Sequence, residues 1–311
     1  MEKLVCVAGP TASGKTALAV RLAQELNGEI ISADSMQIYR GMNIGTAKPS
    51  VEEMDGIPHH MLDVADPSEE YSAARYADEA AAVVDDIRAR GRLPIAAGGT
   101  GLYINALLGR LSFAEEPRDE ALRTRLAEEA KTLGEEAMYA RLAEQDPIYA
   151  RTVHPHNVKR VLRGLEIIAL SGNTVTSRLE QAKSVPLRYE PVIIGLCPQP
   201  REFLVRRIDQ RVDVMMRQGL EREARMLYEK PLSVTAAQAI GYKELFEYFD
   251  GVCTLSEAVE NIRIHTRQYS KRQLTWFRQD SAVNWVTYSE DMNFALILEK
   301  SRDILRKYGI I

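Results

Sequence analysis

The sequence predicts an α/β protein in which helices flank a parallel sheet and an all-helical insertion domain interrupts the chain. Two observations predict the sheet: short apolar runs alternate with helical patterns over the first hundred residues, and a glycine-rich turn directly follows the first run. A third observation predicts the insertion, because a long segment rich in Glu, Arg and Ala precedes the next strand pattern. Sheets of this kind bind ligands at the carboxyl ends of their strands.

The first hundred residues supply strands and connecting helices in alternation. Apolar runs at 4–8, 29–33 and 93–97 have the length of buried strands. Between them, apolar residues recur at helical spacing over 15–26 and 72–90. Because a helix connects one strand to the next, we expect these strands to run parallel.

We expect an α/β core with a helical C-terminal part at 1–112 and 191–311, and a helical insertion domain at 113–190. Sparse leucines among charged residues in the insertion are typical of amphipathic helices. The chain then returns to the sheet through a strand at 192–196. A late strand is expected at 283–287.

Composition excludes several classes of protein. The chain has 311 residues, of which 45% are hydrophobic and 27% charged, as is typical of a globular protein with a sizeable core. No apolar run approaches the roughly 18 residues of a membrane span, so we expect no membrane partner. The three cysteines lie far apart, which excludes a disulfide framework and favours a cytoplasmic location. Nothing in the sequence requires a dimer, and a monomer is the default expectation.

Residues 9–16 match the pattern GxxxxGK[ST] and stand between a predicted strand and a predicted helix. In such a loop, backbone N–H groups and the helix N-terminus surround phosphate oxygens while Lys15 adds a cation. The hydroxyl of Thr16 is the expected ligand for Mg²⁺. The motif predicts a P-loop NTPase-like fold that binds a polyphosphate with Mg²⁺. The residues of this phosphate-binding loop are Gly9, Pro10, Thr11, Ala12, Ser13, Gly14, Lys15 and Thr16.

Asp34 follows the second predicted strand and is the best-placed acid near the phosphate-binding loop. No predicted strand ends in the acidic pair expected of a metal-holding nucleoside-triphosphatase, and the strand at 93–97 ends in glycines and Thr100. A carboxylate beside the loop can act as general base on the group that attacks the phosphate-bearing substrate. The alternative reading of Asp34 is a turn residue or helix cap.

Two stretches contain basic residues and no acid. Residues 151–163 hold four Lys or Arg, and residues 262–278 hold five, interleaved with Tyr269, Trp276 and Phe277. Such stretches suit a nucleic-acid backbone and unstacked bases, or they form solvated helix faces. Three further arginines at 206–211 are mixed with Asp209 and Asp213, so local ion pairing and substrate contact remain open for them.

Several motifs stand in one fixed order along the chain. With these motifs the sequence resembles the bacterial tRNA dimethylallyltransferases, also called tRNA isopentenyltransferases. The resemblance covers nearly the whole chain, including the insertion. The motifs that carry it are 9–16, 34–39 (DSMQIY), 45–49 (GTAKP), 98–103 (GGTGLY), 211–213 (RVD) and 240–243 (IGYK).

The resemblance implies a reaction. The loop would hold the diphosphate of dimethylallyl diphosphate, and the prenyl group would pass to the exocyclic N6 amine of the adenosine just 3′ of the anticodon. Asp34 would be the base, and Thr100 would position the diphosphate or the adenine. Arg211 would clamp the diphosphate, with Arg207 or Arg225 as alternatives.

The resemblance also implies contacts with tRNA. The insertion would grip the anticodon stem-loop, and the basic stretch at 262–278 would face the RNA backbone. The residues implied in tRNA binding are Asp34, Ser35, Met36, Gln37, Thr100, Arg123, Lys159, Arg160, Val161, Leu162, Arg163, Ala239, Ile240, Gly241, Tyr242, Lys243, Glu244, Lys271 and Arg272.

Two other functions are compatible with the phosphate-binding loop alone. A small-molecule or nucleoside kinase would transfer the γ-phosphoryl group of ATP and needs a metal-organising acid, a part that Asp34 could supply. A non-catalytic RNA-binding protein would retain a vestigial loop, but intact Lys15 and Thr16 argue against decay.

Overall fold

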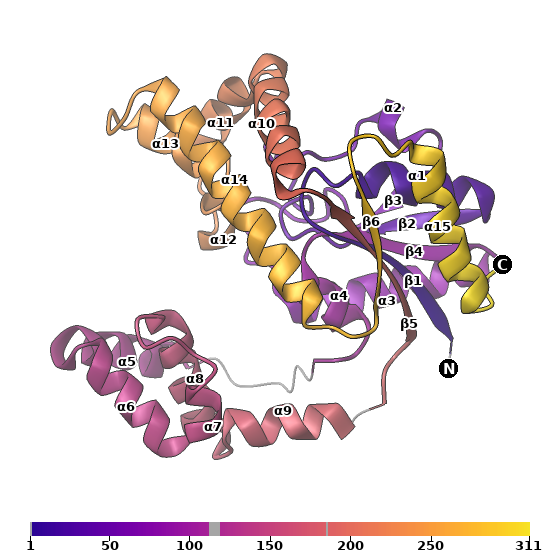
Figure 1. Cartoon of the computed structure of the whole chain (residues 1–311). Coiled ribbons are helices and arrows are strands. Elements are labelled where there is room, and N and C mark those ends of the chain that lie inside the picture. Colours follow the sequence, from indigo (N-terminus) through magenta and orange to yellow (C-terminus); the bar gives the residue numbers. More distant parts are fainter. Residues whose placement is uncertain (1, 112–118, 185) are drawn as a thin grey trace. The chain divides into compact units, whose positions relative to one another are not determined.

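A six-stranded parallel sheet forms the centre of the larger of two compact units, among the residues that the structure describes (2–111, 119–184 and 186–311). This unit comprises residues 1–108 and 188–311 in the computed structural model (Figure 1). The strand order is β3-β2-β4-β1-β5-β6. The strands are β1 (Lys3–Ala8), β2 (Gly28–Ser32), β3 (His59–His60), β4 (Leu93–Gly98), β5 (Glu190–Pro198) and β6 (Val283–Tyr288).

The strands predicted from apolar runs are confirmed, and the α/β fold class with them. Central strand β1 is fully buried from Leu4 to Ala8, as expected for a parallel strand covered on both faces. The predictions missed β3, which spans only two residues at the sheet edge. A strand of that length has no periodicity to detect.

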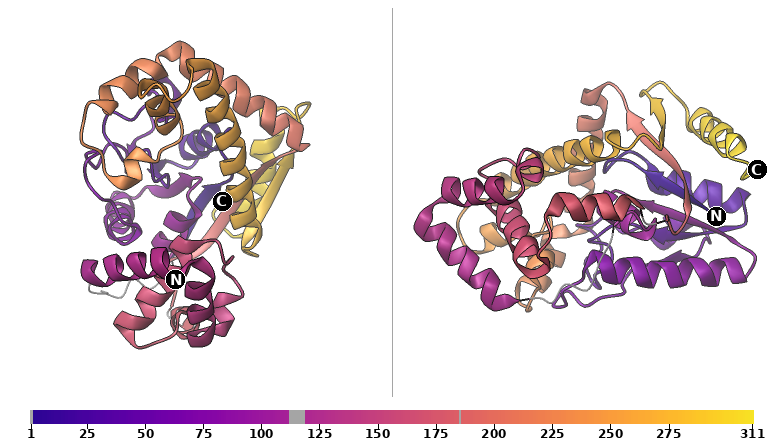
Figure 2. Two further views of the ribbon diagram at one scale, coloured as in Figure 1. Left: turned by 90° about the vertical axis from the view of Figure 1, so that its left-hand side faces the viewer. Right: turned by 90° about the horizontal axis from the view of Figure 1, so that it is seen from below.

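Helices cover both faces of this sheet. Successive residues of β1 point to opposite faces, so its side chains pack against helices on both sides. Val5 and Val7 pack with α1 and α15, whereas Leu4 and Cys6 pack with α3 and α4. Figure 2 shows α15, in yellow, and α3, in purple, on opposite sides of the sheet. The helices of this unit are α1 (Lys15–Glu25), α2 (Val51–Met54), α3 (Ala73–Ala89), α4 (Gly101–Leu107), α10 (Arg201–Gln218), α11 (Leu220–Tyr228), α12 (Val234–Ala237), α13 (Lys243–Phe249), α14 (Leu255–Arg278) and α15 (Phe294–Lys307).

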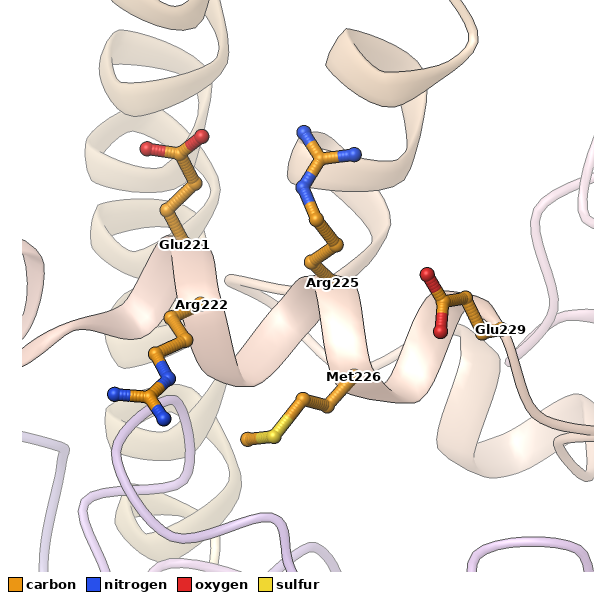
Figure 3. A pocket seen from close by; sticks show the side chains of 5 residues that line it. All are labelled: Glu221, Arg222, Arg225, Met226 and Glu229. Carbon is orange, nitrogen blue, oxygen red and sulfur yellow. The ribbon is translucent and has the colours of Figure 1, made fainter.

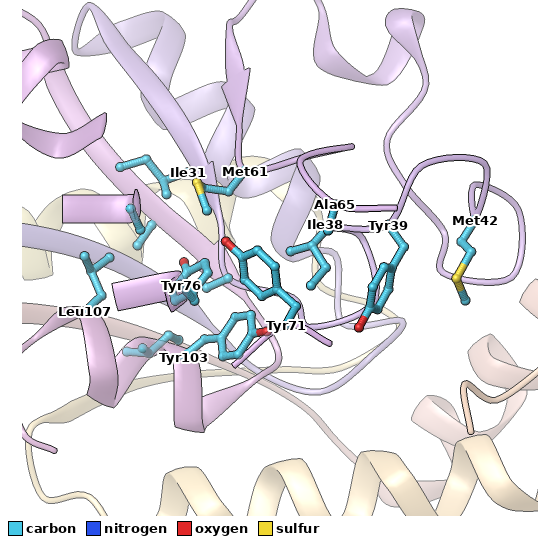
Figure 4. Close-up of a cluster of buried hydrophobic side chains, with 14 of the residues drawn as sticks. Ile31, Ile38, Tyr39, Met42, Met61, Ala65, Tyr71, Tyr76, Tyr103 and Leu107 are labelled. Atoms are coloured by element: carbon cyan, nitrogen blue, oxygen red, sulfur yellow. The ribbon is translucent and has the colours of Figure 1, made fainter. Parts of the chain in front are cut away.

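Tyrosines fill much of the core on the α3 and α4 side (Figure 4). The rings of Tyr76 and Tyr103 stack with their centroids 4.0 Å apart. The hydroxyl of Tyr76 donates to the backbone oxygen of Ser32 at 3.0 Å, which satisfies a fully buried polar atom at the end of β2. The core therefore supports the strand end that carries Asp34.

The second compact unit runs over residues 109–187, and its described elements are all helices. Apolar side chains of α5, α6 and α8, including Leu126, Leu142 and Leu165, form a core of its own. Asp146 accepts hydrogen bonds from the N–H groups of Tyr149 and Thr176 and thereby joins α7 to α9. The helices are α5 (Glu120–Leu133), α6 (Glu135–Gln145), α7 (Pro147–Ala150), α8 (Val158–Ser171) and α9 (Val175–Ser184).

The predicted junction of core and insertion at 112–113 lies outside the described residues. Among the helices that the structure describes, none has the length and apolar character needed to cross a bilayer.

Glu29 ties the amino ends of the strands together. Its side chain is 1% exposed, and it pairs with Arg90, with Arg92 at 3.1 Å and with His60 at 2.6 Å. Hydrogen bonding from Arg90, followed by that from His60, outweighs desolvation and lowers the pKa of Glu29 to about 2. This cluster joins β2, β3 and the turn before β4 at the sheet edge opposite the phosphate-binding loop.

Replacing Glu29 by Gln should lower the free energy of unfolding at pH 7 by roughly 1–2 kcal/mol, a value discounted for the partly exposed arginines. Because the folded pKa of Glu29 is depressed, its contribution is present above the unfolded pKa near 4.5 and is lost as the pH falls toward 2. Urea unfolding of both proteins between pH 7 and 3 measures this. If the difference in the free energy of unfolding between the two proteins does not shrink below pH 4.5, the depressed pKa of Glu29 is contradicted.

Candidate active site

The phosphate-binding loop connects β1 to α1 and lies against β5. Gly14 has a φ of 80° immediately before α1, a left-handed conformation that favours glycine. A Cβ atom on Gly9 would come within 2.8 Å of the backbone oxygen of Leu196, so the loop closes tightly on the neighbouring strand. The predicted residues 9–16 thus form one turn at the N-terminus of α1, where a helix attracts anions.

Lys15 reaches back across this loop and donates a hydrogen bond from Nζ to the backbone oxygen of Pro10 at 2.7 Å. Burial of the ammonium group, followed by the positive charge of Arg211, lowers its pKa to about 8, against an opposing effect of Asp34. The charges of Arg211 and Asp34 are thus close enough to Lys15 to influence its pKa. A phosphate there would supply the negative charge that favours protonated Lys15.

Two arginines of α10 face the loop. Arg207 donates from Nε to the backbone oxygen of Ala12 at 2.7 Å, and Arg211 donates from Nη1 to Oγ1 of Thr11 at 3.5 Å. The predicted clamp Arg211 is therefore near the loop. Its alternative Arg207 is engaged in holding the loop backbone.

The other alternative, Arg225, does not contact the loop. Its guanidinium lies 4.0 Å from the centre of the Phe249 ring. It lines an open hollow on α11 together with Glu221, Arg222 and Met226 (Figure 3). None of the predicted catalytic residues lines this hollow.

Asp34 and Thr100 come together at the carboxyl ends of β2 and β4. The N–H of Ser35 donates to Oγ1 of Thr100 at 3.0 Å, and the N–H of Thr100 donates to the backbone oxygen of Ala33 at 3.1 Å. A Cβ atom on Gly98 would meet that same oxygen at 2.0 Å, so only glycine permits this approach.

One oxygen of Asp34 has a structural partner, because Oδ1 accepts from the N–H of Met36 at 3.0 Å. This bond bears out the turn-residue reading in part. Within the described residues, Oδ2 has no hydrogen bond, so it is available to a substrate.

Sequence reasoning missed Gln273 of α14, which joins the two loops of the site. Its Oε1 accepts from the N–H of Thr11 at 2.9 Å, and its Nε2 donates to the backbone oxygen of Gly99 at 2.9 Å. Tyr269, one turn earlier, has a pKa raised to about 12 by burial and by the charge of Asp34. Both residues lie inside the basic stretch 262–278. The prediction for that stretch rested on its charged residues, which gave no signal for an uncharged glutamine.

The acid-free stretch 262–278 is partly neutralised by acids of other segments. Arg263 pairs with Asp213 at 2.5 Å, and Arg267 pairs with Asp209 at 2.7 Å. The two aspartates of α10 therefore pair with α14 and not with the arginines of their own helix.

Lys271 and Arg272 are exposed and make no ion pair within the described part of the chain. They adjoin Gln273, and the exposed Trp276 packs one turn further along against Gly101. This end of α14 therefore presents free positive charge and an aromatic ring beside the site.

Several residues predicted to bind tRNA have buried side chains. Tyr242 is fully buried and donates from its hydroxyl to Glu223 at 2.7 Å. Glu244 is 1% exposed and accepts from the N–H of Gly241. A continuous motif includes residues that point inward, because successive residues of a helix or turn point in different directions. The buried members are Val161, Ala239, Gly241, Tyr242 and Glu244, whereas Ile240 and Lys243 are partly exposed.

The amide of Gln37 is also engaged internally. Its Nε2 donates to the backbone oxygens of Thr46 at 3.2 Å and Ala47 at 3.0 Å, and its Oε1 accepts from the hydroxyl of Ser32. The structure thus gives Gln37 a role in holding the loop after β2.

In the second unit, the basic residues predicted to bind tRNA gather on α5 and α8. Lys159, Arg160 and Arg163 are exposed, while Leu162 packs against the core. Arg123 donates from Nε to Glu166 at 2.6 Å, and Arg163 pairs with the same carboxylate at 2.8 Å. A buried acid therefore offsets part of the positive charge of this surface.

Affinity for inorganic diphosphate should fall above pH 8, by up to about tenfold per pH unit, because Lys15 loses its proton there in the free protein. Lys15→Ala should bind diphosphate more weakly at pH 7, and its affinity should lack the fall above pH 8 that the ionisation of Lys15 causes. Calorimetric titration of both proteins with Mg²⁺ and diphosphate from pH 7 to 9.5 measures it, and the variant corrects for the ionisation of diphosphate itself. The same pH dependence in both proteins would refute the role of Lys15.

Known proteins are similar to this chain over nearly its whole length. The family model described as IPP transferase matches residues 37–280. The tRNA dimethylallyltransferase of Geobacillus kaustophilus is 49% identical over 300 residues, which cover 96% of this chain and 95% of that protein. The corresponding protein of Bacillus subtilis is 46% identical over 296 residues, covering 95% and 94%.

Solved structures are similar over the same length. The tRNA isopentenylpyrophosphate transferase of Bacillus halodurans superimposes with a TM-score of 0.72 at 43% identity, covering 99% of this chain and 100% of that one. A eukaryotic dimethylallyltransferase acting on tRNA gives 0.81 at 29% identity, covering 99% of this chain and 79% of that one. Because both the family model and these relatives match most of the sequence, the chain belongs to the IPP transferase family of tRNA dimethylallyltransferases.

Proposed function

We propose that this protein is a tRNA-modifying enzyme that transfers the dimethylallyl group of dimethylallyl diphosphate to the exocyclic N6 amine of the adenosine 3′-adjacent to the anticodon. The observation that carries the proposal is the position of Asp34 and Thr100 beside the phosphate-binding loop. A base and a diphosphate site would thereby lie close together at the carboxyl ends of β1, β2 and β4.

The donor half of the reaction breaks the bond between the allylic carbon and the diphosphate oxygen. The loop N–H groups, Lys15 and Arg211 would stabilise the negative charge that develops on the leaving diphosphate. Mg²⁺ would supply further Lewis-acid stabilisation, with the hydroxyl of Thr16, an exposed residue, as its protein ligand. The described residues contain no group of three His, Cys, Asp or Glu that could hold a metal. A hydroxyl together with phosphate oxygens and waters suits Mg²⁺, which keeps several waters in such sites.

The acceptor half forms a carbon–nitrogen bond and releases a proton from the adenine amine. Asp34 would accept this proton through Oδ2, while its Oδ1 stays bound to the N–H of Met36. Thr100 would hold the turn that carries Asp34 through its hydrogen bonds with Ser35. Diphosphate would then leave.

The adenosine lies in a single-stranded loop, so moving it into the site costs only a few kcal/mol of unstacking. Lys271, Arg272 and Trp276 would meet the RNA near the site, and Lys159 with Arg160 would meet it on the second unit. We also propose that the protein acts as a monomer in the cytoplasm, where tRNA is made and used.

Asp34→Asn should lower kcat by about 10²–10⁴-fold, because the amide cannot accept the proton of the amine. Binding of tRNA and of dimethylallyl diphosphate should change only slightly, since Asn keeps the shape and the Met36 contact. Transfer of radiolabel from dimethylallyl diphosphate into unmodified tRNA measures the rate. A tRNA with another nucleoside in place of the target adenosine is the control and should accept no label.

A fully active Asp34→Asn variant would remove Asp34 from the role of base. ATP turnover in the absence of RNA, without label transfer, would replace the prenyl-transfer proposal by a kinase.

Neutralising Lys271 and Arg272 together should weaken tRNA binding and reduce the slope of log K against log salt by about one for each lost phosphate contact. Lys300→Ala is the control, because Lys300 is an exposed lysine of α15. Filter binding between 50 and 300 mM salt gives the slopes. Equal slopes for the double variant and the unmodified protein would return this end of α14 to an ordinary solvated surface.

A further inference from the structure

Glu223 of α11 is a buried carboxylate that is held by backbone N–H groups. It is 6% exposed, and its oxygens accept from the N–H groups of Asn43 at 3.0 Å, Ile44 at 2.8 Å and Gly45 at 3.1 Å. Among the described ion pairs, none involves Glu223. Three consecutive N–H groups converging on one anion form a nest, which usually binds a ligand but here binds a side chain of the same protein.

Tyr242 completes this socket. Its hydroxyl donates to Oε1 of Glu223 at 2.7 Å, and its ring lies directly against Gly45. A Cβ atom on Gly45 would come within 2.5 Å of the ring, so no larger residue fits there. Glu223 and Tyr242 together therefore fix the backbone of residues 43–45 in position and in direction.

The fixed loop leads to the site through Gln37. The backbone oxygens of Thr46 and Ala47, directly after the nest, accept both hydrogen bonds from Nε2 of Gln37. Oε1 of Gln37 accepts in turn from the hydroxyl of Ser32, the last residue of β2. Asp34 lies between Ser32 and Gln37, so both ends of its turn are anchored to the loop that Glu223 holds.

We propose that Glu223 is a positioning residue, which sets the orientation of Asp34 by anchoring residues 43–47 and, through them, Gln37. Charge-assisted bonds to three N–H groups resist displacement better than neutral ones, and they define direction as well as distance. This inference rests on the proposed function, in which Asp34 is the base. It assigns Glu223 an effect on the orientation of Asp34 and no effect on the binding of the diphosphate.

Glu223→Gln is the informative variant, because the amide keeps the size of the carboxylate but turns an NH₂ donor toward backbone N–H groups. We expect kcat to fall roughly 10- to 100-fold, as small displacements of a catalytic group do. The KM for dimethylallyl diphosphate and the Kd for tRNA should stay within about threefold. Glu221→Gln on the outer surface of the same helix is the matched control and should behave as the unmodified protein.

A double-mutant cycle separates positioning from a general loss of structure. In an Asp34→Asn background, Glu223→Gln should change the rate by less than about twofold, because the group that it positions is already absent. Tyr242→Phe keeps the ring against Gly45 and removes one hydrogen-bond donor to Glu223. It should therefore lower kcat as well, but by less than Glu223→Gln does. It also provides a readout if Glu223→Gln does not fold.

Three outcomes would overturn the inference: an unchanged kcat in both Glu223→Gln and Tyr242→Phe, a full additional loss in the Asp34→Asn background, or an equal loss of donor binding. Failure of the proposed function gives a different result, since the unmodified protein would then transfer no label to tRNA. Failure of Asp34 alone as the base would leave Asp34→Asn fully active.

Discussion

The parallel pairing of β4 with both β1 and β2 is the constraint on which the active site depends. Ala97 is in register with Val7 on one side and with Ser32 on the other. The three strands therefore end at the same level, and the turns that follow them emerge side by side. The phosphate-binding loop, Asp34 and Thr100 meet because each lies within a few residues of its strand end.

Helices from the C-terminal part then hold these turns in place. Gln273 binds Thr11 and Gly99 at once, although 262 and 174 positions separate it from them. Arg207 binds Ala12 across 195 positions. Side chains of α10 and α14 thus satisfy the N–H group of Thr11 and the C=O groups of Ala12 and Gly99. The geometry of the phosphate-binding loop consequently depends on the docking of helices that follow the insertion.

Two buried carboxylates of the core, Glu29 and Glu223, illustrate different uses of a buried charge. Glu29 is surrounded by arginines and a histidine at the amino ends of the strands, where its pairing contributes to pH-dependent stability. Glu223 is surrounded by N–H groups, which have fixed directions along the backbone. A cation stabilises a carboxylate from many angles, whereas a row of N–H groups specifies the conformation of a loop.

Local sequence patterns were sufficient to predict the phosphate-binding loop and the strands at 4–8, 29–33, 93–97, 192–196 and 283–287. These features depend on local periodicity and on adjacent residue types, which are visible without a fold. The sequence also indicated Asp34 and Thr100, since residues that follow parallel strands must gather at one edge of the sheet.

Which charges are free and which polar residues are buried depends on tertiary contacts, which those local patterns do not contain. Arg263 and Arg267 are neutralised by aspartates of α10, and Tyr242 turns inward to Glu223. Gln273 joins two loops although it stands in a basic stretch. These outcomes depend on contacts between segments far apart in the chain, and the docking of helices on one another sets such contacts, whereas spacing along the sequence does not.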